Sequence, residues 1–412
     1  MAQTFAFKDV ALQLLGNLFE FFLSRRNAKK AAGEKQEQLT VVGATSGDTG
    51  SAAIYGLRNK SNISIFILHP KGRVSPIQEA QMTTVTDANV HNLAVKGTFD
   101  DCQDIVKALF ADKAFNAKHH LGAVNSINWA RILAQTVYYF LSYFHLGRHL
   151  SSTLSPDELT NIKIQYVVPT GNFGDILAGY FAKRMGLPMV KLVIATNSND
   201  ILARFWKSGA YEKTDTSAEP AEGATAPAEG ASDGKQGTAV GGVKETLSPA
   251  MDILVSSNFE RLLWYLAYEA LAESDAETRP GACETLNSWM QKTLDSIRSY
   301  FEAEPSYVAD PHTAVGLAAA RRIALQNKPS TVQIVLSTAH PAKFSEAVTR
   351  ALQGSSRFNF ERDVLPREFK GLLDKERRVI DVESPDVELV KQVIEAYAEA
   401  AVAPSPEGTL SV

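Results

Sequence analysis

The fold is decided by two segments: VVGATSGDTGSAA at residues 41–53 and VVPTGNFGD at residues 167–175. Each begins with an apolar run, continues through glycines and polar residues, and ends where a helical pattern starts. An apolar run of this length is typical of a buried strand, and small polar residues after it mark a turn. Both segments therefore predict a strand that leads through a short loop into a helix.

The same alternation continues along the chain. Short apolar runs predict strands at residues 39–44, 63–69, 90–95, 164–169, 189–196 and 331–338. Helical patterns lie between them at residues 5–26, 50–59, 101–118, 128–149, 174–185 and 313–326. Alternating strands and helices predict an α/β fold with mostly parallel sheets. In such folds ligands bind where strands end and helices begin, so the loops there are the candidate sites.

Composition limits the classes of function. A chain of 412 residues with 45% hydrophobic and 21% charged residues is globular and large enough for more than one domain. The net charge of −4 gives no general attraction to nucleic acid or anionic membranes. The basic pair Arg25–Arg26 follows the apolar stretch at 5–23, which argues against a signal peptide, and the acidic residues within the stretch argue against a transit peptide. No membrane span is predicted. Cys102 and Cys283 are too few for a disulfide framework, so we expect a cytoplasmic protein.

Two loops could hold anions. Backbone amides and the hydroxyls of residues 45–50, with Ser46, Asp48 and Thr49 at the helix start, suit a carboxylate or a phosphate. The alternative is a helix cap by Ser46 or Asp48 with a glycine turn. The loop at 170–175 has the same form and could hold a phosphate, although glycine turns are also common in large α/β proteins.

Two further elements carry chemistry only in particular surroundings. Asn125, Ser126 and Arg131 could converge on one oxyanion, or else the segment is a helix cap followed by a surface arginine. Lys8 lies among apolar residues, and a desolvated amine can form a Schiff base, but a lysine near a terminus is usually solvated. No metal site is predicted, and His312 and His340, next to prolines, are expected to be structural.

Seven segments in order resemble the threonine synthase family, in its fungal-type branch. They are TFAFKDVALQ, VVGATSGDTGSAA, AVNSINWARILAQ, VVPTGNFGDILAGY, TLSPAMDILVSSNFERLLW, ADPHTAVG and STAHPAKF, and they extend from about residue 3 to residue 352. The resemblance implies a two-domain fold like that of the tryptophan synthase β subunit (fold type II), with pyridoxal 5′-phosphate as cofactor.

The resemblance also implies roles for particular residues. Lys8, in the FKD motif, matches the lysine that forms a Schiff base with the cofactor. Thr338 matches the hydroxyl set against the pyridine nitrogen, where a neutral group leaves the ring unprotonated. The loop that holds the cofactor phosphate is matched by Gly171, Asn172, Phe173, Gly174 and Asp175. Substrate contacts are matched by Asn125, Ser126 and Arg131 for the phosphate, and by Ser46, Asp48 and Thr49 near the carboxylate.

The reaction implied is β,γ-elimination followed by hydration, which converts O-phospho-L-homoserine and water into L-threonine and phosphate. The family branch favours a monomer. Family members carry a segment before the FKD motif, whereas only a few residues precede it here. This leaves open a shortened homologue that binds the cofactor or partners without turnover. Another fold type II enzyme, such as a hydroxyamino-acid deaminase, is a weaker alternative because it would not need the NSINWAR segment.

These inferences give a domain plan. An N-terminal helix at 1–38 carries the cofactor lysine and is followed by a smaller α/β domain at 39–148. A larger cofactor-binding domain comprises 149–211 and 246–380, and 381–412 form a C-terminal helix and tail. Residues 212–245, rich in Ala, Gly, Pro and acid, are expected to be a flexible insertion.

Overall fold

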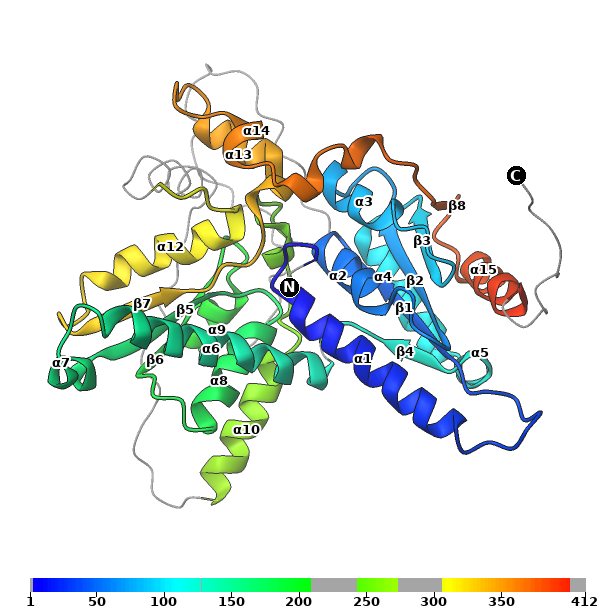
Figure 1. Cartoon of the computed structure of the whole chain (residues 1–412), viewed down its shortest axis with the longest axis horizontal. Helices are drawn as coiled ribbons and strands as arrows, with labels where there is room; N and C mark the ends of the chain where they lie inside the picture. The colour runs from blue at the N-terminus through cyan, green and yellow to red at the C-terminus, as the bar shows by residue number, and fades with distance from the viewer. Residues whose placement is uncertain (1–2, 127, 209–242, 273–305, 401–412) are drawn as a thin grey trace, which may run out of the picture. The chain divides into compact units, whose positions relative to one another are not determined.

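The computed structural model describes residues 3–126, 128–208, 243–272 and 306–400 (Figure 1). Its contacts divide the chain into two compact units, residues 1–131 with 365–412, and residues 132–364. The division falls near the start of a helix predicted from the sequence, whereas the domain plan placed a boundary at 148. Most of the predicted insertion, residues 212–242, lies outside the described residues. Both units alternate strands and helices, which confirms the α/β class.

The first unit contains a five-stranded sheet in the order β4-β1-β2-β3-β8, and all its strand pairs are parallel. Apolar side chains alternate between two buried clusters, one on each face, as expected for a sheet covered on both sides. The strands are β1 (Leu39–Ala44), β2 (Ile63–Pro70), β3 (Val90–Val95), β4 (Leu121–Ala123) and β8 (Ile380–Val382).

Helices cover both faces of this sheet (Figure 1). The cluster on one face includes leucines of α1 and α2, and the cluster on the other includes residues of α4, α5 and α15. The helices of the unit are α1 (Lys8–Asn27), α2 (Asp48–Leu57), α3 (Pro76–Thr83), α4 (Phe99–Ala111), α5 (Lys113–His119) and α15 (Val387–Ala400).

Helices α1 and α2 cross with their backbones in direct contact. A Cβ atom on Gly16 would lie 2.0 Å from the carbonyl oxygen of Gly56, and one on Gly56 would lie 2.5 Å from that of Leu12. Only glycine allows two helix backbones to approach so closely. This crossing fixes α1, which carries Lys8 at its start, against the sheet.

The second unit contains a parallel three-stranded sheet in the order β6-β5-β7. One face packs against α6 and α8, through side chains such as Tyr139 and Leu177, and the other packs against α12 through Val315 and Ala319. The strands are β5 (Lys163–Pro169), β6 (Lys191–Ala195) and β7 (Thr331–Val335). The helices include α6 (Trp129–Leu150), α7 (Pro156–Asn161), α8 (Gly174–Arg184), α9 (Ile201–Ser208), α10 (Phe259–Ala272), α12 (Pro311–Ala324), α13 (Ser345–Leu352) and α14 (Phe360–Asp363).

The predicted elements differ from the structure in a few places. The helix expected at 101–118 is wrong as a single helix, because Asp112 ends α4 and caps α5 by accepting from the amides of Ala114 and Phe115 at 3.1 and 3.0 Å. The three-residue strands β4 and β8 were not predicted, since they are too short to show a periodic pattern. Among the described helices, none is long and apolar enough to span a bilayer.

The helix crossing gives a first prediction. The Gly16→Ala substitution forces the backbones of α1 and α2 apart, and we expect a loss of about 3 kcal/mol in the free energy of unfolding, measured in urea. Gly147→Ala in α6 is the matched control, because no atom of the described residues lies within 4 Å of the added methyl and the helix gains propensity. Equal stability of the two variants would contradict the close crossing.

Candidate active site

In the first unit the loop after β1 is organised by Thr45. The buried Thr45 hydroxyl accepts from the amides of Gly47 and Gly50 at 3.0 and 2.9 Å. The alternative of a helix cap by Ser46 or Asp48 is therefore wrong: α2 has Gly47 at its N-cap, and no side chain caps it. Ser46 and Thr49 are half-buried beside this turn. Neither side chain caps α2.

Asp48 is oriented by a neighbouring helix instead. Its Oδ1 accepts from the side-chain Nε2 of Gln78 at 2.9 Å. Ser75 Oγ donates to the side-chain Oε1 of Gln78 at 2.9 Å. Ser75 caps α3 and Gln78 lies in its first turn, so the start of α3 sets the direction of the Asp48 carboxylate. Gln78 was not among the residues singled out from the sequence, because its role depends on contact between two helices.

Arg131 follows β4, the strand beside β1 in the same sheet. Asn128 accepts from the amides of Ala130 and Arg131 at 3.0 and 3.4 Å, so the predicted cap is present. The alternative of a surface arginine is wrong, because only 3% of Arg131 is exposed. Asn125 is exposed and Ser126 half-buried in the same loop.

The Arg131 guanidinium is buried, and no acidic side chain among the described residues pairs with it. Its Nη1 donates to the carbonyl oxygen of Val124 at 2.7 Å, and its buried Nε has no hydrogen-bond partner among the described residues. Burial lowers the pKa of Arg131 to about 10, which still leaves it protonated at neutral pH. Leaving a buried cation unpaired is costly, so an anion against this guanidinium would be strongly favoured.

Lys8 begins α1 and is firmly held. Asp9 Oδ2 accepts from the Thr4 amide at 2.8 Å, and Thr4 Oγ1 donates to Asp9 Oδ1. The Thr4 carbonyl in turn accepts from Gln81 of α3 at 3.2 Å. Lys8 itself is half-buried, with Nζ 4.5 Å from the centre of the Phe7 ring. The segment before α1 is therefore tied to the unit at several points.

In the second unit the loop after β5 leaves the start of α8 open. Phe173 is the N-cap in a left-handed conformation (φ 63°) and gives no side-chain cap. The carbonyls of Gly171 and Asn172 point toward residues 256–258, where they accept from Ser256 Oγ at 2.7 Å and from Asn258 Nδ2 at 2.8 Å. The amides that follow these carbonyls point the opposite way, and the first amides of α8 have no intrahelical acceptor. This is a cradle for an anion.

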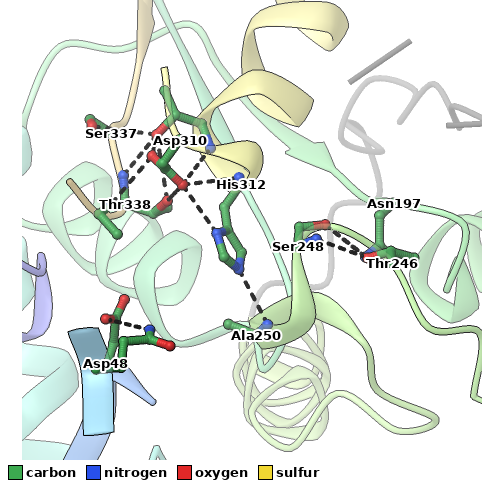
Figure 2. Close-up of polar contacts among 12 residues, drawn as sticks. Asp48, Asn197, Thr246, Ser248, Ala250, Asp310, His312, Ser337 and Thr338 are labelled. Atoms are coloured by element: carbon green, nitrogen blue, oxygen red, sulfur yellow. Dashed lines mark hydrogen bonds and ion pairs between the residues drawn. The ribbon is translucent and has the colours of Figure 1, made fainter. Parts of the chain in front are cut away.

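The adjoining turn at Pro249–Met251 is held from one side by a polar cluster (Figure 2). Asn197 Nδ2 donates to Thr246, Ser248 and Asp252 at 2.8, 2.9 and 2.7 Å. Burial raises the pKa of Asp252, against the opposing hydrogen bonds from Thr246 and Asn197. Asn197 lies just beyond the carboxyl end of β6, and its hydrogen bonds fix residues 246–252 near the loop after β5.

Thr338 lies beyond the end of β7 in a second polar cluster (Figure 2). Its Oγ1 donates to Asp310 Oδ1 at 3.1 Å, and its amide donates to Thr313 Oγ1 at 3.1 Å. His312 Nδ1 lies 3.1 Å from the same Asp310 oxygen. Burial would raise the pKa of Asp310, but hydrogen bonds from His312 and Thr313 outweigh it, so the pKa lies below its ordinary value.

The site residues predicted from the sequence thus form two groups. Those near β1, β4 and the start of α1 belong to the first unit, and those after β5 and β7 belong to the second. The prediction missed Gln78, Thr45 and Asp310, and treated His312 only as structural. The Asp-Pro pair before His312 was a detectable helix-start signal, but its contacts with other loops were not visible in the sequence.

Comparisons with known proteins agree with this geometry. A model described as pyridoxal-phosphate dependent enzyme matches residues 1–246, and one described as threonine synthase, C-terminal, matches residues 313–394. The threonine synthase of Saccharomyces cerevisiae is 52% identical over 95% of this chain and 75% of its own length. The chain belongs to the threonine synthase family.

Solved structures of threonine synthases have the same fold. The crystal structure from yeast matches with a TM-score of 0.81 and 50% identity, covering 97% of this chain and 77% of that one. The pyridoxal-phosphate-bound threonine synthase of Brucella melitensis matches with a TM-score of 0.73 and 38% identity, covering 95% of this chain and 76% of that one. These similarities make the chain a pyridoxal-phosphate-dependent lyase.

The residues present in this threonine synthase family member fit the cofactor. The N-cap of α8, Phe173, has no side-chain cap hydrogen bond, so the first amides of the helix are available to a phosphate. At Gly171, a Cβ would lie 2.7 Å from the carbonyl oxygen of Ala250, so the cradle requires glycine there. Thr338, held beside Asp310, places a neutral hydroxyl beyond the end of the next strand, β7.

Arg131 supplies a prediction about anions. In protein saturated with pyridoxal phosphate, inorganic phosphate at about ten times its dissociation constant should add about 1.4 kcal/mol to the free energy of unfolding. Arg131→Met removes the buried charge and should abolish this gain, as followed by thermal unfolding with and without phosphate. Arg148→Met, which changes an exposed arginine of α6, is the control and should retain it. An unchanged gain in Arg131→Met would exclude an anion site there.

Proposed function

We propose that this chain acts as a threonine synthase, converting O-phospho-L-homoserine and water into L-threonine and inorganic phosphate. In the net reaction the C–O bond to the phosphate breaks at the γ carbon, which becomes a methyl group. Water supplies the hydroxyl at the β carbon. The observation that carries the substrate assignment is Arg131 in the NSINWAR segment, a buried guanidinium for which the described part of the chain supplies no counter-charge.

Each group of residues has a separate task in this proposal. When bound, pyridoxal phosphate supplies an electron sink for charge that develops on the substrate carbons. The amides of residues 171–175 would hold its phosphate, and Thr338 its ring nitrogen. Lys8 would hold the cofactor covalently and afterwards move protons at Nζ as the local base. The hydrogen bonds of Thr4 with Asp9 and Gln81 would fix the start of α1, from which Lys8 extends.

The substrate would be held at its two charged ends by the first unit. Ser46, Thr49 and the Asp48 turn would receive the carboxylate, with Gln78 keeping Asp48 directed. Arg131, with Asn125 and Ser126, would bind the phosphate and stabilise its added charge as it departs. A guanidinium already desolvated acts strongly on such charge, because little water is left to screen it.

We also propose that the enzyme is a cytoplasmic monomer acting on a small molecule. The low cysteine content supports a reducing compartment, and Cys102 is buried as a free thiol whose pKa burial raises to about 12. The other cysteine, Cys283, lies outside the described residues.

Turnover can be tested directly. Purified protein with pyridoxal phosphate and O-phospho-L-homoserine should release phosphate and form threonine in equal amounts. Lys8→Ala should lower kcat by at least about 1000-fold, because it removes both the covalent attachment and the base. Lys60→Ala, which changes a lysine paired with Glu20, is the control.

The possible outcomes separate the alternatives. Cofactor binding without phosphate release would contradict the proposal and favour a homologue that has lost turnover. Full activity in Lys8→Ala would contradict the role of Lys8 while leaving the reaction itself in place.

A further inference from the structure

The buried Asp310 carboxylate receives more donors than a helix cap requires. As the N-cap of α12 it accepts from the amides of His312 and Thr313 at 3.0 and 3.3 Å. It also accepts from Thr338 Oγ1 at 3.1 Å and from the amide of Ala339 at 3.4 Å. These last two belong to the loop after β7, so Asp310 joins the start of a helix to the end of a strand.

The hydrogen bonds of His312 fix its tautomer. The amide of Ala250 donates to His312 Nε2 at 3.2 Å, so Nε2 must carry a lone pair. The proton of the neutral ring therefore lies on Nδ1, which donates to Asp310 Oδ1 at 3.1 Å. Only 3% of His312 is exposed, and its ring packs edge-on against Phe344 at 4.9 Å. The imidazole thus links a carboxylate at one nitrogen to a backbone amide at the other.

Ala250 also contacts the loop after β5, at Gly171. Its carbonyl oxygen lies 2.7 Å from where a Cβ of Gly171 would be, so the two segments are in backbone contact. On its other side the turn is restrained by Asn197 and its partners. A chain of hydrogen bonds therefore runs from Thr338 through Asp310 and His312 to Ala250 (Figure 2). The backbone contact between Ala250 and Gly171 extends it to the loop after β5.

We propose that Asp310 and His312 are positioning residues for pyridoxal phosphate. Asp310 holds the loop after β7 through the Ala339 amide and the Thr338 side chain, and so fixes where the Thr338 hydroxyl lies. His312 sets the position of Ala250 and hence of the Gly171 loop. The two ends of the cofactor site are thereby held at a fixed separation by hydrogen bonds from Thr338 to Ala250 and by the backbone contact between Ala250 and Gly171. This inference rests on the proposed function for the roles of Thr338 and the 171–175 loop.

Two substitutions of His312 separate its two contacts. An asparagine amide nitrogen can replace Nδ1, and a glutamine carbonyl oxygen can replace Nε2. His312→Asn keeps the donor to Asp310 and loses the acceptor for Ala250, and we expect about a tenfold weaker affinity for pyridoxal phosphate with an unchanged absorption maximum. His312→Gln keeps the acceptor and loses the donor, and we expect a shifted absorption maximum of the bound cofactor with an affinity changed less than about threefold.

The measurements are the dissociation constant by fluorescence titration and the absorption spectrum of the loaded protein, with thermal midpoints recorded alongside. His145→Asn, at an exposed position of α6, is the control and should match the wild type. Equal losses of affinity in both His312 variants, with no spectral change, would overturn the inference and leave His312 as a packing residue.

A second pair of variants keeps the test decisive if His312 cannot be replaced. Thr338→Val should shift the absorption maximum, whereas Thr338→Ser, which keeps the hydroxyl bound to Asp310, should not. Identical spectra for the two would contradict the role of Asp310. A wild-type chain that bound no pyridoxal phosphate would overturn the proposed function as well, and phosphate release by the wild type distinguishes the two failures.

Discussion

The parallel direction of the strands is the constraint on which the candidate site depends. In every described pair the two neighbouring strands run the same way, so their carboxyl ends gather at one edge of each sheet. Helices that follow these strands begin at the same edge, where their amides are unpaired. The polar loops after β1 and β4 therefore leave the same edge of the first sheet from neighbouring strands, and those after β5 and β7 do so in the second. The chemistry follows from this arrangement.

Two buried charges show how the site differs from the rest of the core. The Asp310 carboxylate is surrounded by donors from two segments, the start of α12 and the loop after β7, so its desolvation is offset within the protein. The Arg131 guanidinium is almost as deeply buried but has a single carbonyl contact for Nη1 and none for Nε within the described chain. The first charge organises structure, whereas the second leaves a place for the charge of a ligand. A substrate phosphate has the negative charge and the arrangement of oxygens that would pair with the Arg131 guanidinium.

Much of the fold could be predicted because buried parallel strands are continuous apolar runs. The strands at 39–44, 63–69, 90–95 and 164–169 correspond closely to β1, β2, β3 and β5. What could not be predicted depends on contacts between distant segments. Thr45 closes the turn for which the sequence offered Ser46 or Asp48 as alternative caps, because its position after the strand directs its hydroxyl at two amides. The burial of Arg131 likewise has no signature in the sequence.

The account rests most directly on Lys8 as the residue that holds the cofactor. Protein loaded with pyridoxal phosphate can be reduced with borohydride, digested and analysed by mass spectrometry. The account predicts a single modified peptide, carrying the reduced cofactor on Lys8. A label on Lys343, a buried lysine of the second unit, with Lys8 unmodified, would contradict it.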